Sequence, residues 1–168
     1  MLVPGLAVLF CGINPGRWSG AAGHHFANPQ NRFWRALHDS GFTPDLFTPA
    51  TEDRMLAAGL GVTNLVDRTT AGAAELTSAE LRLGAARLED KVRRFAPRVV
   101  CFLGLGAYRG AFGRPGAVAG RQPEQLAEAA VWLVVNPSPL QARYPLAVLV
   151  AQLTELRQWL AGPPSAAP

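Results

Sequence analysis

The chain has 168 residues, of which 49% are hydrophobic, and this size and composition suit one compact domain with a sizeable core. It has no run of 18 or more uncharged apolar residues, and its first ten residues lack the features of a secretory signal, so we expect a cytoplasmic protein without a membrane segment. Cys11 and Cys101 lie inside apolar runs, which excludes a four-cysteine zinc or iron–sulfur site and indicates two small core residues.

The formal charge is +4, and every basic residue except Lys91 and the histidines is an arginine. Between Arg82 and Arg121 lie eight arginines and Lys91, against only Glu89 and Asp90. This excess would favour a polyanion such as nucleic acid, although a solvated arginine-rich surface explains it equally well.

Four short apolar segments, at residues 6–13, 61–66, 98–104 and 130–136, predict buried strands. They are rich in Val, Leu, Ile and Phe and do not alternate with polar residues, which is typical of parallel strands covered on both faces.

Helical patterns separate these segments. One is predicted to start at Asn28-Pro29 and to stop at Gly41, and a second starts at a capping box formed by Thr77 and Glu80. The last follows Pro145 and carries an apolar stripe made of Leu146, Leu149, Leu153, Leu156 and Leu160.

Alternating strands and helices predict an α/β fold, a three-layer α/β/α sandwich with a central, mainly parallel four-stranded sheet. We expect a single domain over residues 1–162 and a flexible tail at 163–168. Such sheets bind ligands where the carboxyl ends of the strands meet. The informative segments are therefore those that follow the strands: GINPG (12–16), VDRTT (66–70), GLGAYRG (104–110) and NPSPLQARY (136–144).

The GINPG turn has two simple interpretations. A phosphate-binding loop is a weak one, because neither the GxGxxG spacing nor the GK[ST] ending is present. A proline-stiffened turn in which Asn14 caps its own backbone is favoured when this motif is taken alone.

Together with NPSPL (136–140), however, the turn resembles the uracil-DNA glycosylase superfamily, and within it the mismatch-specific uracil and thymine glycosylase family. FANPQNRFW (26–34) and GVTNLVDR (61–68) also carry the resemblance, which extends from about residue 6 to 160. It implies an enzyme that flips a nucleotide out of DNA, holds its base in a pocket and hydrolyses the bond between base and sugar.

By this resemblance, Asn14 would position the attacking water, and Asn136 would be the polar group beside the departing base. An amide oxygen can orient water but has no useful basicity. The most active relatives carry aspartate and histidine at these places, and loss of a general base costs about 10²–10⁴ in rate. We therefore expect a slow enzyme. Asp67 and Asp90 are candidates for assisting carboxylates, although turn or surface roles suit both better.

The resemblance also assigns the substrate pocket to Ile13, Gly16, Phe26 and Asn28. Phe26 would stack on the flipped base, and a core phenylalanine is its alternative. Gly16 stands where uracil-selective relatives have a tyrosine that excludes the thymine methyl group. The expected substrate range therefore includes 5-substituted or otherwise modified pyrimidines.

The fourth loop would contact DNA through Ser138, Pro139, Leu140 and Arg143. Leu140 resembles the wedge that fills the space left by the flipped nucleotide, and a residue tucked under its own loop is the alternative. Pro139 replaces the family's usual glycine, which puts guanine-specific reading of the opposite strand in doubt. Two further arginines, Arg109 and Arg114, are expected in a loop after the third strand, where they would contact the DNA backbone.

We expect neither metal nor organic cofactor. His24 and His25 lack further ligands at metal-binding spacing and are expected on a solvent-facing loop. Lys91 lies in a predicted helix away from both motifs, so water is the expected nucleophile and an abasic site the product.

The predicted function is that of a monofunctional, monomeric glycosylase that starts base excision repair at uracil in double-stranded DNA, including G:U mismatches and modified pyrimidines. One alternative is a catalytically weak protein that binds mismatched or abasic DNA. A second is an enzyme acting on small-molecule nucleotides, in which Leu140 would have no purpose.

Overall fold

The computed structural model describes residues 1–141 and 143–162, and the predicted tail at 163–168 lies outside them. The apolar runs form a sheet in the order β2-β1-β3-β5-β4. All neighbouring strands are parallel except β4, which is antiparallel to β5. The strands are β1 Val8–Gly12, β2 Leu60–Asn64, β3 Val99–Leu103, β4 Gly120–Leu126 and β5 Ala129–Val134.

The sheet therefore has five strands, and the prediction of four was wrong in that number. The additional strand, β4, has the sequence GRQPEQL, and only two of its seven residues are buried. It forms an edge of the sheet, and its pairing with β5 is irregular between Arg121 and Gln125, around Pro123. Proline is tolerated at such an edge, and a polar strand of this kind has no apolar run to announce it.

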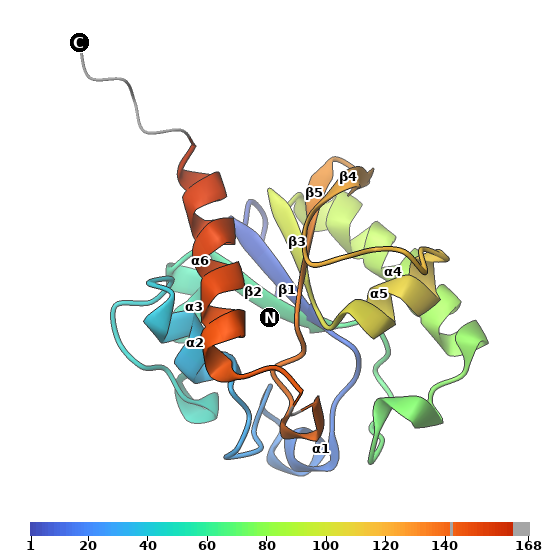
Figure 1. Cartoon of the computed structure of the whole chain (residues 1–168), viewed down its shortest axis with the longest axis horizontal. Coiled ribbons are helices and arrows are strands. Elements are labelled where there is room, and N and C mark those ends of the chain that lie inside the picture. Colours follow the sequence, from blue (N-terminus) through green and yellow to red (C-terminus); the bar gives the residue numbers. More distant parts are fainter. Residues whose placement is uncertain (142, 163–168) are drawn as a thin grey trace.

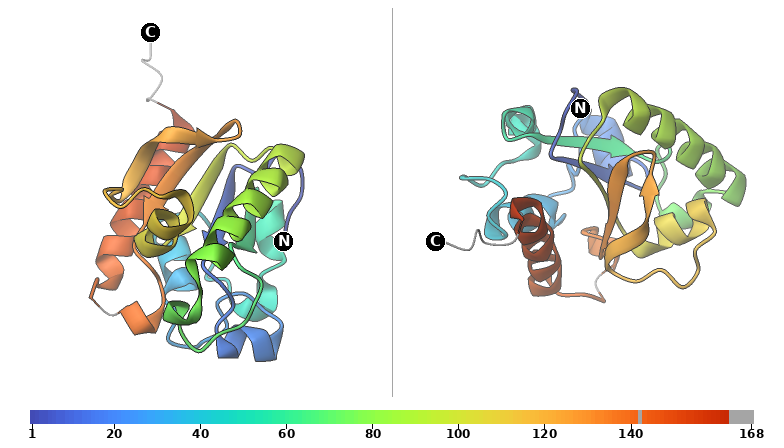
Figure 2. Two further views of the ribbon diagram at one scale, coloured as in Figure 1. Left: turned by 90° about the vertical axis from the view of Figure 1, so that its right-hand side faces the viewer. Right: turned by 90° about the horizontal axis from the view of Figure 1, so that it is seen from above.

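Helices cover both faces of the sheet, which confirms the α/β/α sandwich (Figures 1 and 2). One face packs against α2 (Phe33–Asp39), α3 (Arg54–Ala57) and α6 (Leu146–Ala161). The other packs against α4 (Ser78–Phe95) and α5 (Leu105–Phe112). Both cysteines are buried in the strands, as predicted, and burial raises the pKa of Cys11 to about 12, so this thiol stays neutral.

Two helix boundaries follow the sequence signals. The Thr77 hydroxyl accepts a hydrogen bond from the Glu80 amide at 3.2 Å, and the Glu80 carboxylate accepts one from the Thr77 amide at 2.8 Å, so the predicted capping box opens α4. Helix α6 follows Pro145, and Leu149, Leu153 and Leu156 from its predicted stripe are completely buried.

Helix α2 starts later than predicted. Its first residue is Phe33, because two asparagine side chains bind the backbone just before it and hold it in turns. Asn28 Oδ1 accepts from the Gln30 amide, and Asn31 Oδ1 accepts from the Phe33 amide, each at 2.9 Å.

Residues 104–110, predicted as a loop, mostly belong to helix α5. The glycines in GLGAYRG suggested a turn, but Gly104 alone takes a positive φ, of 120°. Ala107, Tyr108 and Ala111 share one side of the helix and pack against the sheet. Tertiary burial of this face overrides the low helix propensity of Gly106 and Gly110.

The remaining short helices lie in the loops: α1 Arg17–Ala22, η1 Pro49–Thr51, η2 Ala73–Glu75 and η3 Pro139–Gln141. Because β1, β2, β3 and β5 run in the same direction, their carboxyl ends meet at one edge of the sheet, in the lower half of Figure 1. Helices α1 and η3 both lie beyond this edge. In the described part of the chain, no helix combines the length and the apolar character needed to cross a membrane.

Candidate active site

A cavity of about 640 Å³ opens at the carboxyl edge of the sheet. The segments that follow β1, β2 and β5 line it, although the first and the last of them are more than 100 residues apart in the sequence. The cavity brings together most of the predicted site residues, namely Ile13, Asn14, Gly16, Phe26, Asn28, Asn136, Ser138, Pro139 and Leu140. Arg143 does not line it.

The Asn14 amide is held in one orientation by the loop after β2. Its Nδ2 donates to the Arg68 carbonyl oxygen at 2.8 Å and to Thr70 Oγ1 at 2.7 Å. The Thr70 hydroxyl in turn donates to the Gly72 carbonyl at 3.0 Å, so towards Asn14 it acts as an acceptor. A carbonyl can only accept, which requires the nitrogen of the amide on this side and leaves Oδ1 on the other.

The Asn136 amide is held in the opposite sense. Its Oδ1 accepts a hydrogen bond from the Ser138 backbone amide at 2.9 Å. A backbone N–H can only donate, so the oxygen must face Ser138, and the Nδ2 group is left to donate elsewhere.

The cavity therefore offers one oriented acceptor and one oriented donor from two identical side chains. Within residues 1–141 and 143–162, Asn14 Oδ1 and Asn136 Nδ2 have no hydrogen-bond partner. The acceptor can orient a water molecule, and the donor can stabilise a developing negative charge on a bound oxygen.

Phe26 forms an aromatic wall of the cavity. Its φ is 51°, in the left-handed region that a bulky residue rarely adopts, and such strain is common at functional sites. Its ring packs on Phe33, with centroids 4.1 Å apart. Phe26 is half-buried, so it serves the core and also presents ring surface to the cavity.

Close packing surrounds the end of β1. A Cβ atom on Gly12 would lie 2.7 Å from Asn64 Oδ1 and 3.8 Å from Phe26, so a side chain at this position would displace the Asn64 amide. At Gly16, by contrast, a Cβ would have no atom within 4 Å. The cavity is therefore tight beside Gly12 and open beside Gly16.

The Asn28 side chain contributes mainly to the turn before α2. Its Oδ1 accepts from the Gln30 amide, which leaves Nδ2 as the group it can present to the cavity. Ile13 is half-buried and packs against the core that supports α4 and α5.

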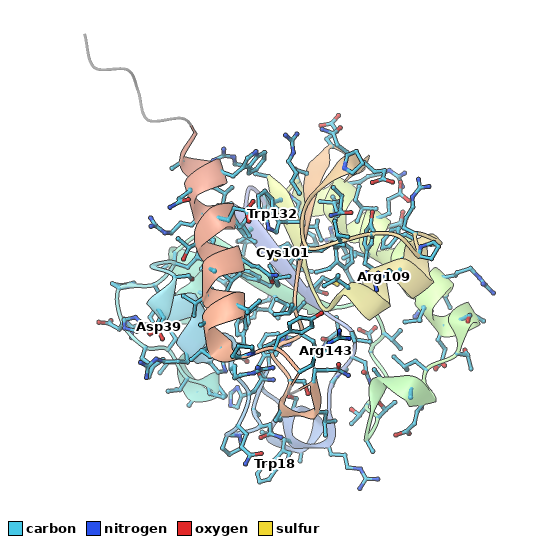
Figure 3. All side chains as sticks on the ribbon, in the orientation of Figure 1. Trp18, Asp39, Cys101, Arg109, Trp132 and Arg143 are labelled. Atoms are coloured by element: carbon cyan, nitrogen blue, oxygen red, sulfur yellow. The ribbon has the colours of Figure 1, made fainter. Side chains whose placement is uncertain are left out.

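The loop after β5 carries an exposed apolar tip. Leu140 lies on η3 at the rim of the cavity, and 72% of its surface is exposed. The Ser138 hydroxyl accepts a hydrogen bond from the Leu140 amide at 3.3 Å, which stabilises the turn. Arg143 is exposed, and its guanidinium lies 5.6 Å from the Tyr144 ring centroid (Figure 3).

Arg32 holds this loop in place. Its guanidinium, at the start of α2, donates to five backbone carbonyl groups, those of Asn136, Pro137, Ser138, Gln141 and Tyr144. The Arg32 backbone amide also donates to the Pro137 carbonyl at 3.1 Å. The loop that carries Leu140 is thereby joined to the segment that carries Phe26.

Glu52 anchors the loop before Phe26. Its carboxylate accepts from the His25 amide at 2.8 Å and lies 3.0 Å from His24 Nδ1. His24 is exposed, as predicted, but His25 is half-buried, which lowers the pKa of its imidazole through desolvation. Both histidines line the cavity, contrary to the expectation of a loop that only faces solvent.

The structure places the two carboxylates considered for catalysis outside the cavity. Asp67 is exposed, and Asp90 is an exposed residue of α4 that lies 3.4 Å from Arg93. Lys91 Nζ donates to Thr63 Oγ1 at 3.2 Å, also outside the cavity lining.

The two arginines expected to contact DNA have other partners. Arg109 donates to the Ala117 carbonyl at 2.9 and 2.6 Å, and Arg114 forms an ion pair with Glu124 at 2.8 Å. Arg109 lies on helix α5, where a loop was predicted (Figure 3).

Sequence reasoning missed four residues of the site: Asn64, Thr70, Arg32 and Glu52. Asn64 is the last residue of β2, but it lies inside the predicted strand 61–66, so the rule that ligands bind at strand ends did not single it out. Arg32 and Glu52 act by contacts with residues 105 and 27 positions away, which no local pattern reveals.

Fold and site together define an α/β/α protein with a polar and aromatic cavity at the carboxyl ends of parallel strands, a setting that suits a planar polar ligand such as a nucleobase. Residues 2–160 match the family model of the Uracil DNA glycosylase superfamily, and the chain belongs to this superfamily. Membership supports DNA glycosylase activity on uracil, a hydrolase function in DNA repair, with uracil-containing DNA as the partner.

Proposed function

We propose that this protein is a monofunctional, mismatch-specific uracil-DNA glycosylase that flips uracil out of double-stranded DNA, including G:U pairs, and releases it by attack of water. It would start base excision repair as a cytoplasmic monomer. The opposite orientation of the Asn14 and Asn136 amides carries this proposal, because hydrolysis of the glycosidic bond needs both an acceptor for water and a donor for the departing base.

In the proposed reaction, the bond between C1′ of deoxyribose and N1 of uracil breaks, and its electron pair leaves with the base. Asn14 Oδ1 accepts a hydrogen bond from the water that attacks C1′, and Asn136 Nδ2 donates to a uracil oxygen. The proton lost by the water passes to solvent, and the uracil anion is protonated after its release. Neither amide changes its protonation state.

Slow turnover follows from this chemistry. The two carboxylates proposed as assistants, Asp67 and Asp90, lie outside the cavity, and Glu52 is engaged by His24 and His25. With a water that is oriented but not deprotonated, we expect a rate about 10²–10⁴ below that of an enzyme with a general base.

Phe26 and Asn64 would recognise the base. The Phe26 ring provides a stacking surface, and the Asn64 amide lies beside it, where it can form hydrogen bonds with the polar edge of a pyrimidine. Open space at Gly16 supports tolerance of 5-substituted pyrimidines. The exposed position of Leu140 supports its role as the wedge, with Ser138, Pro139 and Arg143 contacting the DNA.

Single-turnover excision from a labelled duplex tests the proposal. The substrates carry uracil opposite G, uracil opposite A, or uracil in a single strand, and alkali converts each abasic product into a strand break. We expect excision opposite G, no break before alkali, and no covalent complex after borohydride treatment. A borohydride-trapped complex would contradict attack by water.

The Asn14→Ala variant tests the assigned role of the acceptor. We expect its single-turnover rate on uracil to fall at least tenfold, while Asp90→Asn, a change on the exposed face of α4, leaves the rate within twofold of wild type. Equal rates for Asn14→Ala and wild type would refute the assignment.

A protein that binds mismatched or abasic DNA without useful turnover is the second candidate. The observation that favours it is the neutral amide at both catalytic positions. The same assay separates the two functions, because a binding protein would retain the duplex in a gel-shift experiment and release no uracil under single-turnover conditions.

A further inference from the structure

Helix α1 carries a large aromatic side chain that the proposed mechanism does not use. Trp18 is 60% exposed, and none of the six residues of α1 is buried. Burial of a tryptophan ring is a substantial source of free energy, which packing within this chain leaves largely unused here. Trp18 is therefore better explained by a contact with another molecule than by the stability of the fold.

The packing of α1 directs Trp18 outward. A Cβ on Gly20 would lie 2.7 Å from Thr69 Oγ1, so Gly20 marks the side of α1 that faces the loop after β2. Two residues along a helix correspond to a rotation of about 200°, which places Trp18 on the opposite side. Figure 3 shows Trp18 at the lower end of the molecule, pointing away from it.

Trp18 and Leu140 belong to the rim of the same cavity. Trp18 comes from the segment after β1, and Leu140 from the segment after β5. Both are exposed apolar side chains, and the neighbouring residue Arg17 is exposed as well and carries a positive charge. An exposed aromatic ring next to a cation suits a nucleic acid, which offers apolar base faces and negative phosphates.

We propose that Trp18 is a second DNA-contacting residue, whose indole stacks on a nucleobase next to the flipped nucleotide while Leu140 occupies the space that the nucleotide has left. This inference rests on the proposed glycosylase function. It assigns two apolar contacts to the DNA, one from the segment after β1 and one from the segment after β5.

Binding of an uncleavable duplex tests the proposal. The probe is a fluorescent duplex that carries a tetrahydrofuran abasic analogue opposite G, and binding is followed by anisotropy at fixed salt. Stacking of one base on an aromatic side chain corresponds to an affinity loss of about 5- to 150-fold when the ring is removed. We expect a loss in this range for Trp18→Ala and a smaller loss for Trp18→Phe, which keeps a ring.

Val118→Ala is the matched control, because Val118 is 65% exposed and does not line the cavity. We expect its affinity to equal that of wild type. Thermal unfolding of each variant should match wild type, since Trp18 makes little contact with the core. Equal affinities for Trp18→Ala and wild type would overturn the proposal.

Tryptophan fluorescence provides an independent measurement. Trp34, Trp132 and Trp159 are present in both proteins, so the difference between wild type and Trp18→Phe reports on Trp18. We expect the duplex to quench the fluorescence of wild type more than that of Trp18→Phe. Equal quenching in the two proteins would count against stacking. A change in sedimentation of the free protein caused by Trp18→Ala would instead assign the ring to a contact between two copies of this chain.

The outcomes separate this proposal from the proposed function. A wild-type protein that excises uracil but binds DNA equally well with and without Trp18 refutes the stacking alone. A wild-type protein that binds through Trp18 but never releases uracil refutes the glycosylase function and leaves the contact intact.

Discussion

Two asparagines in the cavity present different groups although their side chains are identical. Asn14 presents its oxygen, because a carbonyl and a hydroxyl hold its nitrogen, whereas Asn136 presents its nitrogen, because a backbone amide holds its oxygen. The orientation of each amide therefore depends on the group behind it. Thr70, a buried residue at the end of the VDRTT segment, fixes the orientation of the Asn14 amide in this way.

The open space at Gly16 leads to a prediction about substrate range. A tyrosine introduced by Gly16→Tyr meets no nearby atom at its Cβ, and its φ of −75° is one that any residue adopts, so the variant should fold. Its ring would occupy the open side of the pocket. We expect excision of 5-hydroxymethyluracil to fall at least tenfold relative to uracil, measured as single-turnover rates.

Gly106→Tyr is the control for this prediction. Gly106 also has open space at its Cβ, but it lies on α5 and does not line the cavity. The ratio of the two excision rates should stay at its wild-type value in this variant. An unchanged ratio in Gly16→Tyr would show that Gly16 does not control access of 5-substituents.

At the scale of structural elements, a residue at the start of α2 fixes the conformation of the loop after β5. The Arg32 guanidinium binds five carbonyl groups of that loop. One belongs to Pro137, next to Asn136, and another to Gln141, next to Leu140. A fork of five N–H donors suits this task, whereas lysine carries three donors on a single nitrogen and cannot bind all five carbonyls.

We expect Arg32→Ala and Arg32→Lys to lower excision from duplex DNA at least tenfold, because Leu140, the proposed wedge, loses its support. In a double-mutant cycle, Arg32→Ala combined with Leu140→Ala should cost less than the product of the single effects, since both changes remove the same function. Arg35→Ala, which breaks only a surface ion pair with Asp39, is the control. Independent effects that multiply would contradict a shared role.

The start of α4 links the helix to the loop that orients Asn14. Glu80 accepts from Arg68 Nε at 2.8 Å and from the Thr77 amide, and these hydrogen bonds, that from Arg68 foremost, lower the pKa of its carboxyl group to about 2. The carbonyl group of Arg68 in turn holds the Asn14 amide. The same arginine therefore connects the capping box to the candidate active site.

This lowered pKa predicts how stability depends on pH. Because the folded value lies below the ordinary value of 4.5, the stabilisation by Glu80 is fully present above about pH 4.5 and is lost as the pH falls towards 2. Glu80→Gln should therefore lower the melting temperature at pH 7, and the difference from wild type should shrink between pH 4.5 and 2. A difference that stays constant over this range would exclude the carboxylate as its source.

At the scale of the whole molecule, the sandwich is held by two apolar layers, one on each face of the sheet. Leu153 lies on α6 in the layer that also contains Phe33, and it is completely buried. Truncation of a buried leucine costs about 2–5 kcal/mol, because the lost burial is combined with the cost of a cavity.

Leu153→Ala should therefore lower the free energy of unfolding by about 2–5 kcal/mol, measured by urea denaturation. Leu83→Ala, on a 54% exposed residue of α4, should change it by less than about 0.5 kcal/mol. A cost for Leu153→Ala as small as that for Leu83→Ala would mean that α6 is not packed as described.

Much of the fold was predictable from the sequence, because its signals are local. The four parallel strands, the capping box at Thr77 and the leucine stripe of α6 each arise from residues close together in the chain. β4 and α5 were missed because their residues do not show the expected pattern: β4 is a polar edge strand, and α5 contains glycines that indicate a turn.

By itself, the sequence determined the layered architecture, the segments that reach the cavity and the residue types available there, since burial and chain direction follow from local apolar periodicity. Only the tertiary structure decided how these residues are oriented. Which end of each amide faces the cavity, which carbonyls hold Arg32 and which way Trp18 points depend on contacts between segments far apart in the chain. Such contacts leave no periodic pattern, because each hydrogen bond is satisfied only after the strands have brought their loops together.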